Sequence, residues 1–166
     1  MTGGGRQTLL VLRHGKSSWA DPALDDHDRP LKGRGRRGAA SIGHQLREAD
    51  LLPDLVLSST ARRAHSTARR CLEASGAEAP LQVTRELYGG GAARHLDEIG
   101  RRAGDEIATV LVVGHNPDLE DLVATLTGEP VTLKTAFLAV ISLDLDGWAD
   151  LITARGRLTR LLRPQP

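Results

Sequence analysis

The chain has 166 residues and a formal net charge of +1, a length that fits one domain with a sizeable core. This near-neutral balance gives no general electrostatic case for binding nucleic acid or an anionic membrane. The single cysteine, Cys71, excludes an internal disulfide and any zinc site built from several cysteines.

The amino terminus lacks the apolar core of a signal peptide, and no apolar run approaches the ~18 residues of a membrane span. Together with the lone cysteine, this predicts a soluble, cytoplasmic protein. We expect one domain over residues 1–166, with its core at about 8–154. Residues 1–5 are expected to form a loose tail, and residues 157–166 a solvated end.

Strand and helix signals alternate along the chain, which is typical of α/β proteins. The early strand candidates are apolar throughout, as expected when helices cover both faces of a sheet. The last two are joined by Asp146-Gly147, a two-residue hairpin signal. The expected strands are 8–13, 54–58, 81–84, 109–114, 136–145 and 148–154, and the expected helices are 31–49, 61–74, 93–102 and 117–127. The sequence therefore predicts a three-layer α/β/α fold, whose mostly parallel sheet has an antiparallel C-terminal hairpin.

Two of the apolar strands lead directly into a histidine. Residues 9–12 precede Arg13-His14-Gly15, and residues 110–113 precede Gly114-His115. The carboxyl ends of parallel strands are where ligands bind in open α/β sheets. Asn116 is predicted to cap the helix that follows the second histidine. Two histidines at this edge, with arginines available, indicate chemistry on a phosphoryl group.

The residue types around His14 suit nucleophilic attack on phosphorus. An imidazole attacks only through an unprotonated nitrogen, and nearby cations favour the neutral ring. Arg13 and a second arginine could supply that charge and also bind the phosphate oxygens. Gly15 would let the backbone approach the oxyanion, because it carries no Cβ.

The start of the helix over 61–74 offers a second group of phosphate ligands. Ser59 or Thr60 is predicted to cap it, which places Arg62 and Arg63 in its first turn. A helix N-terminus favours anions, and an arginine there would add a bidentate fork.

Three ordered motifs resemble the histidine phosphatase superfamily, the phosphoglycerate-mutase-like proteins. They are Arg13-His14-Gly15, Ser59 with Arg63-Ala64-x-x-Thr67-Ala68, and Gly114-His115. Two further stretches resemble its short SixA-type branch, namely Arg13 to Trp19, and Asp28-Arg29-Pro30-Leu31 followed by Arg34-Gly35. The similarity runs from residue 8 to about 154, in the family's order, and implies a phosphoglycerate-mutase-like fold.

The resemblance also implies a role for each matched residue. His14 matches the nucleophile that becomes phosphorylated, and Arg13 and Arg63 match the two phosphate-binding arginines. His115 matches the second histidine, which hydrogen-bonds the phosphoryl group and stabilises its transition-state charge. Ser17 lies where family members often place another phosphate contact. The family's reaction requires no metal and no other cofactor.

The leaving group bears on which substrate is expected. An alkoxide is a poor leaving group and calls for a general acid, whereas imidazole leaves from phosphohistidine far more readily. Glu86 is the candidate acid, although the sequence around it does not match the acid-bearing insertion of mutases. The short chain also leaves little material for a lid over a small substrate.

These observations favour a phosphatase that acts through a phosphohistidine intermediate on His14, with a phosphohistidine-bearing protein as substrate. One alternative is a phosphomonoesterase for a sugar phosphate, a nucleotide or another small metabolite. Another is a phosphate-binding module without catalysis, which would need no histidine nucleophile. The expected partner is therefore a phosphorylated protein or metabolite, with no nucleic acid and no membrane, and the sequence does not fix an oligomeric state.

Overall fold

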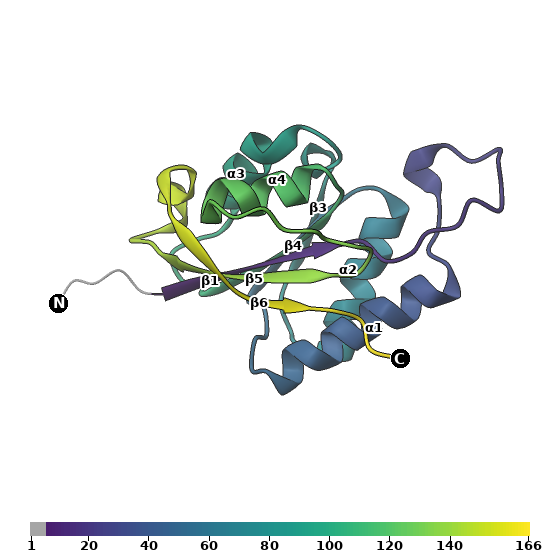
Figure 1. Ribbon diagram of the computed structural model, residues 1–166, viewed down its shortest axis with the longest axis horizontal. Helices are drawn as coiled ribbons and strands as arrows, with labels where there is room; N and C mark the ends of the chain where they lie inside the picture. Colours follow the sequence, from purple (N-terminus) through teal and green to yellow (C-terminus); the bar gives the residue numbers. More distant parts are fainter. Residues whose placement is uncertain (1–5) are drawn as a thin grey trace.

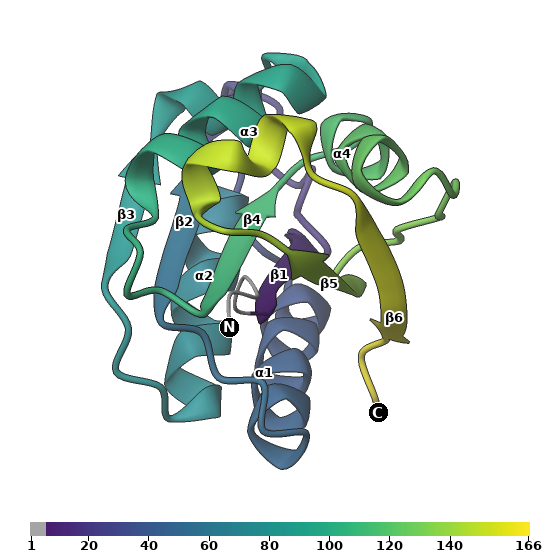
Figure 2. The same ribbon diagram turned by 90° about the vertical axis from the view of Figure 1, so that its left-hand side faces the viewer.

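The computed structural model describes residues 6–166, which form a six-stranded sheet with helices on both faces (Figures 1 and 2). The predicted tail, residues 1–5, lies outside the described residues. Along the sheet the strand order is β3-β2-β4-β1-β5-β6. Strands β1 to β4 pair in parallel, whereas β5 runs antiparallel to β1, and β6 antiparallel to β5. The strands are β1 (Arg6–Arg13), β2 (Leu55–Ser59), β3 (Leu81–Thr84), β4 (Thr109–Gly114), β5 (Leu138–Asp144) and β6 (Gly156–Leu162). The predicted α/β class and mostly parallel sheet are confirmed.

Two pairs of helices form the outer layers. Helices α1 (Gly33–Glu48) and α2 (Arg62–Ser75) cover one face, and α3 (Gly91–Arg102) and α4 (Asp118–Thr127) cover the other (Figure 2). Successive residues of β1 point to opposite faces, so its apolar side chains enter both cores. Leu10 packs in the α1 and α2 core, and Leu9 in the α3 and α4 core. None of the helices within residues 6–166 is both long and apolar enough to cross a membrane.

The predicted strand over 148–154 is wrong, because this segment forms a 3-10 helix, Trp148–Thr153. Trp148 and Leu151 are buried three residues apart, which is the period of such a helix, and they pack against α3. The Trp148 indole Nε1 also donates to the Ile107 carbonyl at 2.7 Å. Gly147 is extended, with φ −165°, so the expected hairpin turn at Asp146-Gly147 is absent.

The last strand, β6, occupies residues that we expected to form a solvated end. Its arginines lie on an exposed edge of the sheet, where charged side chains are common. The register shifts between Val140 and Ile141 of β5, which pair with Arg160 and Leu158. This bulge places one extra residue in β6 and disturbs the alternation of apolar residues. The antiparallel C-terminal pair therefore exists, but its second strand follows the 3-10 helix.

Helix α1 meets the residues after β1 through two glycines. A Cβ on Gly15 would lie 2.6 Å from the Gly35 carbonyl oxygen, and a Cβ on Gly35 would lie 2.1 Å from the Lys16 carbonyl oxygen. Both obstacles are backbone atoms, which cannot move aside as a flexible side chain can. This close approach anchors the segment immediately after β1 to the start of α1.

We expect Gly35→Ala to lower the free energy of unfolding by about 1–3 kcal/mol, the usual cost of overpacking. The greater helix propensity of alanine, about 1 kcal/mol, opposes this loss but does not cancel it. Urea denaturation would measure the change. Gly33→Ala is the matched control, since its Cβ would meet only the ends of the Arg36 and Arg37 side chains. Equal stability of the Gly35→Ala and Gly33→Ala variants would contradict the contact described above.

Candidate active site

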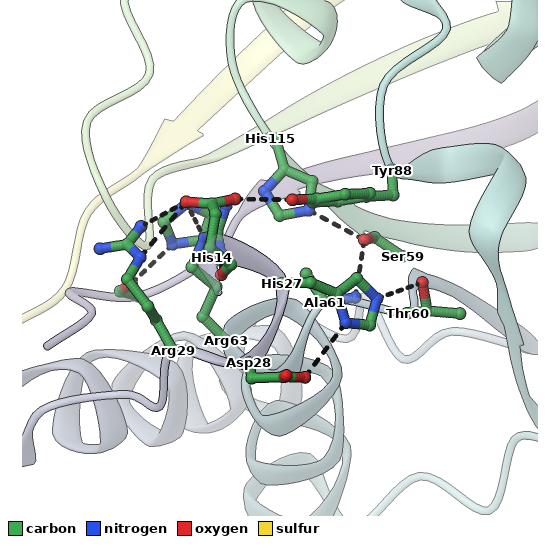
Figure 3. Close-up of polar contacts among 12 residues, drawn as sticks. His14, His27, Asp28, Arg29, Ser59, Thr60, Ala61, Arg63, Tyr88 and His115 are labelled. Atoms are coloured by element: carbon green, nitrogen blue, oxygen red, sulfur yellow. Dashed lines mark hydrogen bonds and ion pairs between the residues drawn. The ribbon is translucent and has the colours of Figure 1, made fainter. Parts of the chain in front are cut away.

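The strand order brings the two predicted histidines together. Strands β1 and β4 are parallel neighbours, and Arg13 lies opposite Gly114 in their register. His14 and His115 follow these residues, so they emerge side by side at the same edge of the sheet (Figure 3). Their ring centroids are 5.2 Å apart.

Arg63 joins them from the first turn of α2. Its side chain is buried, and its Nε donates to His14 Nε2 at 3.4 Å. The other two nitrogens are held by Asp26: NH1 donates to the backbone carbonyl at 2.6 Å, and NH2 to carboxylate Oδ2 at 2.9 Å. The preceding Arg62, which the sequence also places in this turn, is exposed. The structure thus distinguishes the two adjacent arginines as the sequence motif does.

Arg13 completes the group of four. Its NH1 donates to the Leu133 carbonyl at 3.0 Å, while its buried Nε has no acceptor within residues 6–166. The four side chains border one cavity of about 280 Å³, a volume that admits a phosphoryl group. The lining residues are Arg13, His14, Lys16, Ser17, Trp19, Arg29, Arg63, His115, Asn116 and Thr135.

Hydrogen bonds fix which nitrogen of His14 can act as a nucleophile. Nδ1 lies 2.7 Å from the Gly15 carbonyl oxygen, which can only accept, so Nδ1 carries the ring proton. Nε2 then holds a lone pair, and Arg63 Nε–H points to it. The ring nitrogen that faces Arg63 is therefore the unprotonated one.

The surroundings also keep both imidazoles neutral. Burial lowers the pKa of His14 from 6.5 to about 4, helped by the positive charges of Arg63, Arg13 and Arg29. Burial, followed by the neighbouring His14 and Arg63, lowers the pKa of His115 to about 3. At neutral pH the cavity consequently combines two uncharged imidazoles with arginine side chains.

His115 is oriented by a serine at the end of β2. Its Nε2 lies 2.8 Å from Ser59 Oγ, and that oxygen already accepts the Ala61 backbone N–H. The hydroxyl proton is thus free to be donated to Nε2, which leaves the ring proton on Nδ1. Nδ1 is buried and has no partner in the described part of the chain. His115 can therefore present an N–H donor to an oxyanion.

The depressed pKa values predict that the protein becomes less stable in weak acid. The unfolded chain binds protons near pH 6.5, whereas folded His14 and His115 resist protonation down to about pH 4 and 3. The free energy of unfolding should therefore fall as the pH is lowered from 6.5 toward 4, by up to about 1.4 kcal/mol per pH unit for each histidine. Urea denaturation at pH 7 and pH 5 measures this, and His14→Asn should show a weaker pH dependence. The same slope in the wild type and in that variant would contradict the assignment.

Two expectations about helix starts are wrong. Neither Ser59 nor Thr60 caps α2, whose N-cap is Ala61 without a side-chain bond. Both hydroxyls instead meet imidazoles, since Thr60 Oγ1 lies 2.8 Å from His27 Nε2. Asn116 does not cap α4 either; its amide donates to the Leu133 carbonyl at 2.8 Å and to Glu120 at 3.1 Å.

The remaining predicted site residues take different places. Ser17 is buried and lines the cavity, so its role as a phosphate contact stays a prediction. Gly15 does not offer its N–H to a phosphate, because that group donates to Thr67 Oγ1 at 2.9 Å. Gly15 positions His14 instead. Glu86 does not line the cavity, and its half-exposed carboxylate is paired with Arg94.

Three residues near the site were missed as functional residues. Asp26 lies in a short 3-10 helix, Asp26–Asp28, and accepts a hydrogen bond from Tyr88 Oη at 2.7 Å as well as from Arg63. The Tyr88 ring also stands edge-on to His115, at 5.5 Å between centroids. Arg29, from the same loop as Asp26, lines the cavity. The Asp28-Arg29-Pro30-Leu31 motif and the length of the polar connection from Ser17 to Pro30 pointed to this loop, but neither said which side chain turns inward.

Comparison with known proteins agrees with this geometry. The family model of the histidine phosphatase superfamily (branch 1) matches residues 9–88, which include His14 and Arg63. An uncharacterized chloroplastic protein of Arabidopsis thaliana is 32% identical over 156 residues, covering 89% of this chain and 72% of its own length.

Two solved bacterial structures are similar over nearly their whole length. The putative phosphohistidine phosphatase SixA from Nakamurella multipartitia is 32% identical, with a TM-score of 0.84 over 98% of this chain and 99% of that one. The putative phosphohistidine phosphatase SixA from Agrobacterium tumefaciens is 31% identical, with a TM-score of 0.80 over 95% and 98% of the two chains. The chain belongs to the histidine phosphatase superfamily, and within it to the short SixA-type branch.

Proposed function

We propose that the protein is a phosphatase whose reaction passes through a phosphohistidine on His14. In the first step the His14 Nε2 lone pair attacks phosphorus, and the bond from phosphorus to the leaving atom breaks with its electron pair. In the second step water attacks the same phosphorus, the phosphorus–Nε2 bond breaks, and inorganic phosphate leaves. The proposed steps use no metal.

The observation that carries this proposal is the state of His14. Its Nε2 is unprotonated and lies beside Arg63, and both residues line the cavity. Arg13, Arg63 and His115 line the same cavity, and Arg13 Nε and His115 Nδ1 have no partner within residues 6–166 and can donate to the phosphoryl oxygens. Positioning and charge stabilisation of this kind supply most of the catalysis in phosphoryl transfer.

Neither carboxyl group near the site can act as a general acid, so the site suits a leaving group that departs without being protonated by the enzyme. Glu86 is paired with Arg94 and lies off the cavity. Partial burial acts to raise the pKa of Asp26, but hydrogen bonds from Tyr88 and Arg63, with the charges of Arg63 and Arg29, lower it to about 2. Asp26 is thus ionised at neutral pH and has no proton to donate. We therefore favour a nitrogen leaving group over an alkoxide.

A protein-borne phosphohistidine is the substrate that fits best. When its other ring nitrogen carries a proton, breaking the phosphorus–nitrogen bond releases a neutral imidazole, whose conjugate acid has a pKa near 6.5. The two SixA neighbours are described as putative phosphohistidine phosphatases, which supports the same substrate class. Sugar phosphates and nucleotides, the alternative class, would release a far more basic alkoxide.

A substrate panel on the purified protein in EDTA tests the proposal. We expect phosphoramidate and a phosphohistidine protein to be hydrolysed, and sugar phosphates and nucleotides to react at least about 100-fold more slowly, the usual contribution of a general acid. Glu86→Gln should leave every rate within about twofold. Faster hydrolysis of an alkyl phosphate, lost on Glu86→Gln, would establish the small-molecule alternative. Abolition of all turnover by EDTA would exclude the metal-free reaction.

A further inference from the structure

A third arginine, Arg29, borders the catalytic cavity. It lies in the long connection between β1 and α1, the loop that projects beyond the sheet in Figure 1. Most residues of this loop are exposed, yet Arg29 is only 7% exposed. It lines the same cavity as His14, Arg13 and Arg63. Burying a guanidinium in a surface loop is costly unless its donors are used.

Two neighbours hold the guanidinium of Arg29 in place. Its Nε and NH2 face Asp26 Oδ1, at 3.3 and 3.2 Å. Its planar group also lies over the Trp19 ring, 3.5 Å from the centroid, as in a close cation–π pair. The third nitrogen, NH1, is buried and has no acceptor within residues 6–166. The neighbours thus use one edge and one face of the group, and leave NH1 unpaired.

The unpaired NH1 belongs to a wider pattern at this cavity. Across residues 6–166, five buried side-chain nitrogen or oxygen atoms lack a hydrogen-bond partner. Four belong to residues that line the cavity, namely Arg13 Nε, Arg29 NH1, His115 Nδ1 and Asn116 Oδ1. Buried polar groups are normally paired, so a cluster of exceptions around one cavity marks a ligand position. Three of the four are donors, which is the requirement of an oxyanion.

We propose that Arg29 is a third arginine of the phosphate site, which binds a phosphoryl oxygen through NH1 while Asp26 and Trp19 fix its orientation. This assignment rests on the proposed function, because the oxyanion it binds is the phosphoryl group of the substrate.

Asp26 explains how three arginines can share so small a site. Its Oδ1 faces Arg29, while its Oδ2 accepts from Arg63 NH2, so a single carboxylate lies between the two guanidinium groups. The carboxylate offsets part of their mutual repulsion and fixes the angle at which each approaches the cavity. The β1–α1 loop is therefore part of the site, and its folding delivers Arg29 to it.

The test measures binding of inorganic phosphate by isothermal titration calorimetry. We expect Arg29→Met to raise the Kd about 10- to 100-fold, the usual range for a hydrogen bond to a charged group. Arg62→Met is the matched control, because it removes one exposed arginine beside the site, and its Kd should stay within about twofold. A Kd unchanged in folded Arg29→Met would overturn the proposal.

Two further variants separate ligand binding from a purely structural role. Arg29→Lys keeps the charge but loses the planar fork, so the Kd should rise by less than in Arg29→Met. Trp19→Ala loosens the same loop and removes the stacking partner, but the two contacts with Asp26 still orient Arg29, so its effect should be smaller than that of Arg29→Met. If Trp19→Ala weakens phosphate binding as much as Arg29→Met, the loss comes from the loop and the proposal fails. If Arg29→Met does not fold, the Kd of Arg29→Lys is compared with the Kd of Trp19→Ala. The proposal then fails if Trp19→Ala raises the Kd as much as Arg29→Lys does.

Because the Kd for inorganic phosphate is measured without turnover, the test of Arg29 is independent of the proposed reaction. A wild-type protein that binds phosphate but never becomes phosphorylated would refute the reaction and leave the Arg29 comparison intact. A wild type that forms phosphohistidine, with an Arg29→Met variant of unchanged affinity, would refute the role of Arg29 alone.

Discussion

Replacing His14 with asparagine should abolish formation of the phosphorylated enzyme and reduce turnover by about 10⁴-fold or more. An asparagine amide is not a nucleophile at neutral pH, whereas the imidazole Nε2 of His14 is unprotonated and its lone pair faces the Arg63 Nε–H. The asparagine NH2 can still donate to the Gly15 carbonyl in place of Nδ1, so the local backbone has a reason to stay as it is. The measurement is incorporation of acid-labile ³²P from labelled phosphoramidate, followed by steady-state hydrolysis of the same substrate.

His95 provides a matched control for this experiment. It is buried like His14 but lies on α3, where its Nδ1 contacts the Gly91 carbonyl at 2.8 Å. His95→Asn should therefore retain the acid-labile label even if it lowers stability. Retention of the label in His14→Asn would show that another residue is phosphorylated. Absence of the label in both variants and in the wild type would favour a phosphate-binding module over an enzyme.

The second large effect is expected at Arg63. Arg63→Lys should lower kcat/KM about 10²- to 10³-fold, the usual result of losing one preorganised donor to a developing anion. All three nitrogens of the guanidinium are positioned, one against His14 and two against Asp26. A lysine ammonium keeps the charge but cannot reproduce this planar set of contacts.

Arg62→Lys is the control on the same helical turn. Arg62 is exposed and does not line the cavity, so the substitution should leave kcat/KM within about twofold. Comparable activity of Arg63→Lys and the wild type would contradict the assignment of Arg63 as a phosphate ligand. Equal losses in the two lysine variants would indicate a general disturbance of the first turn of α2 and not the loss of a phosphate ligand.

The site residues that the sequence predicted share a local property. His14 and His115 each follow a short, wholly apolar segment, and Arg63 stands at a fixed place in the first turn of a helix. Such patterns survive in the sequence because strand ends and helix starts are set by neighbouring residues. The resemblance to a family then assigned roles to these positions, which the hydrogen bonds of His14 support for the nucleophile.

The predictions that failed concern places where distant contacts decide the structure. Apolar residues at 148–154 suggested a strand, but packing of Trp148 against α3 makes a 3-10 helix. Arginines at 157–163 suggested a solvated end, but the free edge of β5 recruits that segment as β6. Gly15 was expected to make room for a phosphate, but it makes room for the backbone of Gly35.

The sequence by itself therefore determined the α/β class, the positions of most helices and strands, and the two histidines with their two arginines. The tertiary structure decided that β1 and β4 are neighbours, which is what sets His14 against His115. It also decided that the β1–α1 loop folds back, so that Asp26 and Arg29 reach the cavity. The physical reason is the range of the interactions: short periodic patterns encode local structure, whereas strand order and the path of a polar loop depend on contacts between residues far apart in the chain.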